Sequence, residues 1–439
     1  MTYEAALAEL ARLPSFERQA ARGLKRGLER IAALLEALGH PERAYPVIHV
    51  GGTNGKGSTC AFLAAIWQAA GYRVGLHTSP HLLELGERMR VNGKPASREW
   101  IADFVGRARP WIARIEPSYF EFTVAMSLAY FAHQEVDLAV VEVGLGGRWD
   151  ATNVLLPELA IVTNVGTDHA EILGPTPVEI AREKAGIFKP GRPALTAARH
   201  KEARCVLEQV AREVGCSLEY VPGRVRWERL RLSWEALSGD LYTPAGSYPE
   251  LELGLLGLHQ LENAALAVRA AERLSERFSR LNPEAIRTGL ARVRQLSGLR
   301  ARMERLLERP RLILDVAHNP EGVRALLQTI RRLPVVGRRW LLFGVLADKD
   351  YARMVPALAA WADAVIVTEP PSKRALAAER LREAFEALGR PTACHKTVQE
   401  AWAALRDQAE SEDLILACGS TYLVAELLCL FGERADPRL

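Results

Sequence analysis

The sequence VIHVGGTNGKGST at residues 47–59 contains the pattern around which the chain is organised. A short apolar strand leads into a turn with four glycines and one lysine that ends in the hydroxyl pair Ser58 and Thr59, and a helical pattern follows at residues 61–70. Glycine lets successive backbone N–H groups point into one concavity, and the start of the following helix adds positive potential. We therefore expect a phosphate-binding loop in which Lys56 contacts the outer phosphates and Ser58 or Thr59 holds Mg²⁺.

The spacing of this loop departs from the common pattern GxxxxGK[ST]. Gly57 separates Lys56 from Ser58, and Val50 stands where the first glycine would fall. A glycine-rich turn with a solvated lysine is the simpler alternative. The combination of four glycines, a lysine and a hydroxyl pair within so short a segment favours the phosphate loop.

Length and charge limit the classes of protein to be considered. A chain of 439 residues exceeds what one hydrophobic core usually serves, so two domains are expected. Basic residues number 57 against 53 acidic ones, which gives no argument for a nucleic-acid partner or an anionic membrane. The six cysteines form no CxxC pair, and no apolar run of roughly eighteen residues occurs, so we expect a cytoplasmic protein with reduced thiols.

Strand and helix patterns alternate through residues 1–296, which we expect to form the first domain. Strands are predicted at residues 72–76, 138–143 and 159–162, and a small antiparallel patch is predicted within residues 218–256. Helices are predicted within residues 3–38 and at 97–115, 119–134, 259–274 and 283–293. The nearly continuous apolar strand at 138–143 is typical of a parallel sheet. The alternation predicts a doubly wound α/β domain whose ligands lie beyond the carboxyl ends of its strands.

A second alternation begins after a linker pattern at residues 295–300. Its strands are predicted at residues 312–316, 340–345, 364–368 and 414–417. We expect residues 297–439 to form a smaller, Rossmann-like α/β domain without a phosphate loop of its own.

Three polar side chains of the first domain fall at predicted strand ends, namely Ser79, Glu142 and His169. Glu142 is the one charge in an apolar strand, and the simpler alternative is an acid that faces solvent or pairs with Arg148. Its place beside a glycine-rich loop favours a Mg²⁺ ligand. His169 is equally compatible with a buried structural histidine and with a metal or phosphate contact. Lys184 closes a helix, where a lysine commonly complements the helix dipole.

In the second domain, Asp315 and His318 lie at a strand end and on the turn into a helix. Asn319 followed by Pro320 is an ordinary helix start. That accounts for two of these four residues and leaves Asp315 and His318 available to hold a substrate group.

Together these motifs resemble the folylpolyglutamate synthase family, including its bacterial forms that are also dihydrofolate synthases. The resemblance is carried in order by GTNGKGS at 52–58, TSPHL at 78–82, EVGLGGR at 142–148 with DATN at 150–153, EKAGI at 183–187 and DVAHN at 315–319. The wider Mur ligases share the phosphate loop but not the TSPHL segment.

The resemblance implies a nucleotide and metal site in the first domain. ATP would be bound by Thr53, Asn54, Gly55, Lys56, Gly57 and Ser58. A first Mg²⁺ would be held by Ser58, Ser79 and Glu142, and a second by His169 and Lys184, which is carbamylated in this family. Lys56, Lys184, Asp315 and His318 would be the catalytic residues.

The resemblance also implies the remaining contacts of the substrates. Asn263 would lie at the adenine, Arg302 at the γ-phosphate, and Asp315 on the ATP side of the second domain. The folate and glutamate would contact Phe122, Gly146, Arg148, Asp150, His318 and Ser420. Ala301, Val316 and Cys418 depart from the family's usual residues, and the choice between Arg300 and Arg302 stays open.

The implied activity is an ATP-dependent amide ligase that adds L-glutamate to folates, and to dihydropteroate, through an acyl phosphate. We expect a monomer with ATP and two Mg²⁺ ions, and no nucleic-acid or membrane partner. Two alternatives are kept. One is another Mur-type amino-acid ligase that acts on a nucleotide-linked peptide, and the other is a P-loop ATPase that acts on nucleic acid.

Overall fold

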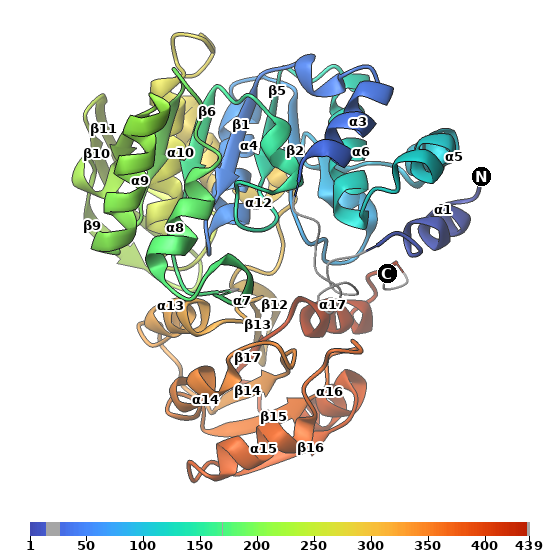
Figure 1. Ribbon diagram of the computed structural model, residues 1–439. Coiled ribbons are helices and arrows are strands. Elements are labelled where there is room, and N and C mark those ends of the chain that lie inside the picture. Colours follow the sequence, from blue (N-terminus) through green and yellow to red (C-terminus); the bar gives the residue numbers. More distant parts are fainter. Residues whose placement is uncertain (15–26, 169, 437–439) are drawn as a thin grey trace.

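The structure is a computed structural model and describes residues 1–14, 27–168 and 170–436. Figure 1 shows a larger α/β domain above a smaller one, with α13, α7 and α17 near their junction. No helix among the described residues has the length and apolar character needed to cross a membrane. The predicted pair of α/β domains, the first doubly wound and the second smaller, is confirmed.

The larger domain is built on an eight-stranded sheet with the order β4-β3-β2-β5-β1-β6-β7-β8. Its strands are β1 (Val47–Gly51), β2 (Val74–His77), β3 (Met89–Val91), β4 (Lys94–Pro95), β5 (Leu138–Glu142), β6 (Leu159–Val162), β7 (Pro193–Thr196) and β8 (Ser217–Tyr220). The six strands from β2 to β8 in this order are parallel, and β3 and β4 add an antiparallel edge. Because β1 lies between β5 and β6, Val50 pairs with Glu142 and Gly51 with Val162, which brings three strand ends together.

Helices cover both faces of this sheet. They are α1 (Tyr3–Leu10), α3 (Glu29–Ala37), α4 (Lys56–Ala69), α5 (Arg98–Ile115), α6 (Tyr119–His133), α7 (Ala170–Leu173), α8 (Pro177–Ala185), α9 (Lys201–Val214), α10 (Gln260–Arg273), α11 (Pro283–Ala291) and α12 (Val293–Ser297). Val140 packs with α4 and α10, whereas Val141 packs with α3, α5 and α6 on the other face. This alternation explains why β5 is apolar at almost every position.

A separate antiparallel sheet of β9 (Arg226–Leu232), β10 (Leu237–Thr243) and β11 (Gly246–Leu253) packs beside α10 and α11. It confirms the predicted antiparallel patch but is shorter than predicted. The predicted patch starts at residue 218, inside β8, but β8 pairs in parallel with β7 and belongs to the main sheet.

The smaller domain has the strand order β12-β13-β17-β14-β15-β16. Its elements are β12 (Glu304–Glu308), β13 (Arg311–Leu314), α13 (Pro320–Ile330), β14 (Arg339–Phe343), α14 (Tyr351–Ala359), β15 (Ala364–Thr368), α15 (Ala378–Glu386), β16 (Thr392–His395), α16 (Val398–Arg406), β17 (Leu414–Cys418) and α17 (Thr421–Leu430). The edge strands β12 and β16 were not predicted because they are half exposed and lack an apolar run. We propose that the domains divide in segment 298–303, close to the predicted boundary after residue 296.

Helix α11 packs closely against α4, the helix that follows the phosphate loop, and this contact provides a test of the fold. A Cβ atom on Gly289 of α11 would lie 2.5 Å from Ile66 Cα and 2.6 Å from Ile66 N in α4. Both are backbone atoms, so neither side can yield. Gly289→Ala should lower the free energy of unfolding by roughly 2–3 kcal/mol, although a helical Gly→Ala change normally stabilises by up to about 1 kcal/mol.

Urea unfolding followed by circular dichroism measures this difference. Gly246→Ala is the matched control, because a Cβ atom there meets nothing within 4 Å. We expect the control to stay within about 0.5 kcal/mol of the parent protein. A Gly289→Ala protein as stable as the parent would contradict the described contact between α11 and α4.

Candidate functional site

The phosphate loop joins the end of β1 to the start of α4, as the strand–turn–helix pattern predicts. Gly52 has φ +142° and Gly55 has φ +82°, a region that favours glycine. A Cβ atom at Gly52 would clash with Thr163, and one at Gly55 would clash with Asn263. The loop is therefore pressed against its neighbours, and the first N–H groups of α4, which have no partners within the helix, lie at its end.

The side chain of Lys56 folds back over this loop. Its Nζ atom donates to the carbonyl oxygens of Gly52 and Thr53, each at 3.2 Å. These are neutral acceptors, and an ammonium group forms stronger hydrogen bonds to anionic oxygens such as those of a phosphate. The Lys56 charge is thus held where a phosphate chain could take over its contacts.

Glu142 stands at the end of β5 and faces the interior with 5% exposure. Its Oε2 atom accepts a hydrogen bond from Ser79 N at 3.1 Å. Burial raises the pKa of Glu142, and Lys56, the Ser79 N–H and Arg302 oppose that rise. A Cβ atom on Gly57 would lie 3.6 Å from this carboxylate and 3.5 Å from Arg302 Nη2. A carboxylate, an arginine and the first turn of α4 therefore meet at one point.

Helix α10 covers the first turn of α4. Gln260 Nε2 donates to Ser58 Oγ at 3.4 Å, and Asn263 Oδ1 accepts from Thr59 Oγ1 at 3.4 Å. Asn263 Nδ2 also donates to Gln260 Oε1 at 2.9 Å, so the two amides orient each other. Sequence reasoning missed Gln260, although its place one turn before Asn263 on the same helix was the available signal.

The structure separates the two arginines left open by the sequence. Arg300 pairs with Glu304 at 2.5 Å and with Glu433 at 3.3 Å, away from the phosphate loop. Arg302 extends to the start of α4, as its approach to Gly57 shows. Ala301 has φ +58°, a conformation that favours glycine. Geometry therefore favours Arg302.

Lys184 of α8 is buried with 2% exposure. Burial, followed by the charge of Lys56, lowers its pKa to about 7, while Asp168, Asp150 and Glu321 act in the opposite direction. Such an amine is partly neutral near neutral pH and can act as a nucleophile. His169, the predicted partner of Lys184, lies outside the described residues.

The second domain presents Asp315 and His318 directly after β13. Both oxygens of Asp315 accept backbone hydrogen bonds, Oδ2 from Met303 N and Oδ1 from Ala317 N, each at 2.8 Å. His318 Nδ1 lies 2.8 Å from Val316 O, so Nδ1 carries the proton and donates it to that carbonyl. His318 Nε2 is consequently the basic nitrogen and points towards Asp168 Oδ2, 3.7 Å away.

Asn319 joins the two domains across the phosphate loop. Its Oδ1 atom caps α13 by accepting from Gly322 N at 2.8 Å, as the helix-start pattern predicts. Its Nδ2 atom donates to Asn54 Oδ1 and to Asp168 Oδ2, both at 3.0 Å. The phosphate loop and the turn that carries His318 are therefore in direct contact.

The residues predicted to contact folate do not all lie at a surface. The Phe122 prediction is corrected, because its ring is fully buried against Phe104 in the core. Phe120, two residues earlier, is partly exposed and lies so close to Gly144 that a Cβ atom there would clash with its ring. Two phenylalanines two residues apart on a helix face different sides, so Phe120 is the one beside the glycine-rich loop.

The Asp150 carboxylate forms hydrogen bonds within its own loop, and its predicted contact with substrate stays a prediction. Its Oδ2 atom accepts from Leu145 N at 2.8 Å, and Oδ1 accepts from Thr152 N at 3.0 Å. Both oxygens thus shape the loop that contains Gly146, whose φ is +69°. Arg148 N donates to Glu183 O at 2.8 Å, which places this loop against the end of α8 near Lys184.

Ser420 lies at the end of β17, the strand next to β13. Its Oγ atom caps α17 by accepting from Tyr422 N at 3.1 Å. Gly419 N donates to Ala317 O at 2.9 Å, so Ser420 and the Asp315 turn belong to the same edge of the sheet. This edge faces the phosphate loop through Asn319.

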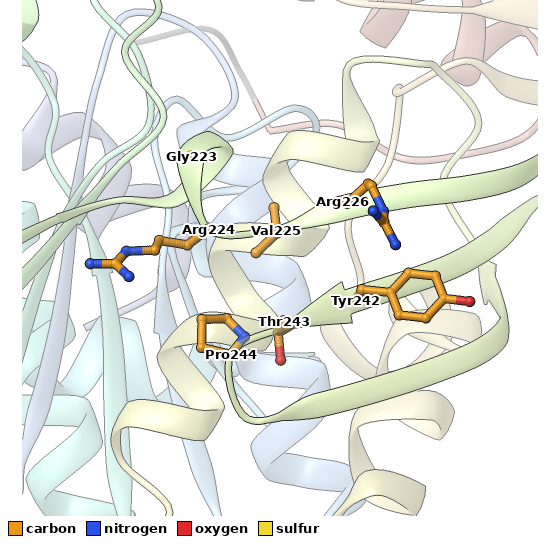
Figure 2. A pocket seen from close by; sticks show the side chains of 7 residues that line it. All are labelled: Gly223, Arg224, Val225, Arg226, Tyr242, Thr243 and Pro244. Atoms are coloured by element: carbon orange, nitrogen blue, oxygen red, sulfur yellow. The ribbon is translucent and has the colours of Figure 1, made fainter.

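Figure 2 shows a shallow depression of about 390 Å³ beside η4 (Val221–Gly223), between the start of β9 and the end of β10. Of its two arginines, Arg224 and Arg226, the second lies over the ring of Tyr242, 5.1 Å from the centroid. None of the strand-end residues lines this depression, and we assign the site to the phosphate loop instead.

Known proteins resemble the whole chain. The Mur ligase middle domain matches residues 50–271, and the Mur ligase, glutamate ligase domain matches residues 301–421. The dihydrofolate synthase/folylpolyglutamate synthase of Bacillus subtilis (strain 168) is 36% identical over 92% of this chain and 95% of its own length. That of Escherichia coli (strain K12) is 34% identical over 93% of this chain and 92% of its own.

Solved structures agree with these sequence matches. E. coli FolC in complex with DHPP and ADP superposes with a TM-score of 0.86 at 32% identity, over 98% of each chain. Mycobacterium tuberculosis folylpolyglutamate synthase complexed with ADP gives a TM-score of 0.88 at 31% identity, over 99% of this chain and 100% of the other. The chain therefore belongs to the folylpolyglutamate synthase and dihydrofolate synthase family of Mur ligases.

Proposed function

We propose that this protein joins L-glutamate to the carboxylate of a folate, and also to that of dihydropteroate, in a reaction driven by ATP. One observation carries the proposal: the turn with His318 contacts the phosphate loop itself through Asn319 and Asn54. A phosphate donor held by the loop and an acceptor held by the second domain would share one interface. The relatives from B. subtilis and E. coli, both named dihydrofolate synthase/folylpolyglutamate synthase, support the same reaction.

The proposed reaction has two steps, phosphorylation of the substrate carboxylate and attack by the amine of glutamate. The substrate carboxylate oxygen attacks the γ-phosphorus of ATP, the bond to the β-phosphate oxygen breaks, and ADP leaves. The amine of glutamate then attacks the acyl phosphate carbon, the carbon–oxygen bond to phosphate breaks, and the amine loses a proton as the amide forms. The released phosphate keeps one oxygen from the substrate carboxylate.

The donor set fits Mg²⁺ at the phosphate loop. No group of three or more His, Cys, Asp or Glu side chains placed to hold a metal occurs in the described part of the chain. Ser58, Ser79 and Glu142 offer hard oxygen atoms with one carboxylate, and Mg²⁺ typically takes few protein ligands and completes its shell with phosphates and water. When bound, Mg²⁺ would neutralise phosphate charge and favour attack by an anion. His169 and Lys184 remain the proposed second site.

The side chains of this protein have complementary tasks in the proposal. Lys56 and Arg302 hold the phosphates and reduce repulsion between two anionic reactants. His318 Nε2, left basic by the Nδ1 hydrogen bond to Val316, is placed to take the proton of the attacking amine. Contact between the two domains excludes water from an acyl phosphate that would otherwise hydrolyse.

The two alternatives make different predictions for ADP release. A ligase that acts on nucleotide-linked peptides would be stimulated by UDP-linked substrates, and a nucleic-acid ATPase by DNA or RNA. The near-balanced charge supports neither nucleic acid nor an anionic membrane as a partner. We propose a cytoplasmic monomer. It should release ADP only when glutamate and a pterin substrate are both present.

Isotope transfer tests the proposed reaction. The folate or dihydropteroate carboxylate is labelled with ¹⁸O and incubated with protein, Mg²⁺, ATP and glutamate. We expect one ¹⁸O atom in each released phosphate, detected by mass spectrometry or by the ³¹P shift, because the carboxylate oxygen stays on phosphorus. Unlabelled phosphate formed together with the amide product would exclude the acyl phosphate.

Lys56 provides a prediction for the nucleotide side of the site. Lys56→Met should lower kcat by roughly 10²–10³-fold, because one preorganised cationic donor to the reacting phosphate is lost. The exposed Lys94 of β4 is a matched control, and Lys94→Met should leave steady-state ADP formation unchanged. Equal kinetics for both variants would place the phosphates elsewhere.

Lys184 provides a prediction with a defined pH direction. A pKa of about 7 leaves its amine protonated below neutrality and nucleophilic above it. Incubation with ¹³C-bicarbonate should therefore give a carbamate signal in ¹³C spectra that grows between about pH 6 and pH 8. Lys184→Met should remove this signal and lower activity by roughly 10–100-fold, whereas the exposed Lys201→Met should retain the signal. A signal that persists in Lys184→Met would assign it to another amine.

A further inference from the structure

A carboxylate that follows the last helix of the smaller domain is buried against the larger domain. Residues 431–436 follow α17, and we call them the return segment. In Figure 1, α17 lies on the side of the smaller domain that faces the larger one. The Asp436 side chain at the end of this segment is only 4% exposed, and its backbone N donates to Leu83 O at 2.8 Å.

The carboxylate of Asp436 is held by three parts of the larger domain. Its Oδ2 atom accepts from Tyr3 Oη of α1 at 2.5 Å and from Leu85 N at 2.8 Å. Its Oδ1 atom lies 3.6 Å from Arg98 Nη2 of α5. Burying a carboxylate is costly unless its partners are specific and well placed. An apolar side chain would hold the segment without this desolvation cost. The directional polar contacts therefore indicate that the position of the segment relative to Leu85 and Tyr3 matters.

Leu83 and Leu85, which form hydrogen bonds with Asp436, belong to the loop of residues 78–88, which has many internal hydrogen bonds. The carboxylate of Glu87 accepts from Leu82 N at 2.8 Å, from Leu83 N at 3.1 Å and from Glu84 N at 3.3 Å. Thr78 N donates to Arg88 O at 3.3 Å and closes the loop at its ends. Leu83 also packs in the apolar core of the smaller domain. The loop is therefore held together by its own hydrogen bonds and contacts both domains.

The 78–88 loop also carries Ser79, whose N–H donates to Glu142 in the phosphate site. Asp436 N donates to Leu83 O, Leu83 N donates to the Glu87 carboxylate, and Glu87 O accepts from Thr78 Oγ1 at 3.5 Å, so hydrogen bonds connect Asp436 to the residue before Ser79. We propose that Asp436 is a positioning residue: it ties the return segment to the 78–88 loop, so that the placement of Ser79 beside Glu142 depends on the docked smaller domain. This inference rests on the proposed role of Ser79 and Glu142 at the nucleotide.

Two measurements on the full-length protein test this role. The first is glutamate-dependent ADP formation at increasing MgCl₂, and the second is hydrogen exchange of the Ser79 amide without metal or substrate. Asp436→Ala should raise the Mg²⁺ concentration for half-maximal rate by about fivefold, the factor that matches the loss of one ordinary hydrogen bond. The maximal rate should change less, and the Ser79 amide should exchange faster although it lies in another part of the loop from Leu85.

Related variants sharpen the result. Asp436→Asn keeps one acceptor oxygen and should give a smaller shift in the same direction. Tyr3→Phe removes one donor to the same carboxylate, and adding it to Asp436→Ala should cause little further change, because the two groups act as one contact. Arg434→Gln alters the charge of an exposed residue of the same segment and should leave both measurements unchanged.

The outcome that overturns the inference is specific. If Asp436→Ala lowers the melting temperature but shares the Mg²⁺ dependence and the Ser79 exchange of Arg434→Gln, then Asp436 anchors the segment and does not position Ser79. If the parent protein forms no ADP with glutamate and a pterin substrate, the proposed function fails instead. In that case the exchange of the Ser79 amide still decides the role of Asp436.

Discussion

A buried carboxylate beside the start of a helix is the constraint on which the site depends. Glu142 is removed from water at the end of β5, and burial alone would favour its neutral form. The Ser79 N–H, Lys56 and Arg302 stabilise its charge, and each comes from a different part of the chain. Their convergence requires β1 to lie between β5 and β6, because that register brings the phosphate loop next to Glu142. The strand order of the sheet therefore determines which side chains meet at Glu142.

The contact between the two domains has a polar part at the phosphate loop, beside the apolar clusters that the domains share. Asn319 contacts both Asn54 and Asp168, and Lys349 Nζ lies 3.3 Å from the same Asp168. Polar contacts of this kind exchange more readily than apolar ones, which suits an interface that has to admit and release substrates. The 78–88 loop adds a second connection at the other side of the site, where it packs on the smaller domain and bonds to Glu142.

The roles of Ser79, Glu142 and Asp315 in binding stay predictions. Prediction from sequence did place all three at or just after strand ends, where the structure has them, and parallel strands present their carboxyl ends at one edge. It failed for Phe122, whose helix turns its ring inward while Phe120 stays near the glycine loop. The edge strands β12 and β16 were missed for a related reason. Edge strands are half exposed, so their composition resembles that of loops.

The sequence by itself determined the phosphate loop, the alternation of strands and helices, and the resemblance to one family. These depend on short-range chemistry: glycines that allow a left-handed turn, a lysine beside them, and apolar runs with strand length. Only the tertiary structure decided which of Arg300 and Arg302 reaches α4, that Asp150 shapes a loop, and that Asp436 returns to Tyr3 and Leu85. The contacts of Arg302 and Asp436 join residues hundreds of positions apart, and no local pattern encodes a pairing that exists only after the domains have folded against each other. The Asp150 contacts are local in sequence, but the N–H groups that face its side chain are fixed only when the loop has folded.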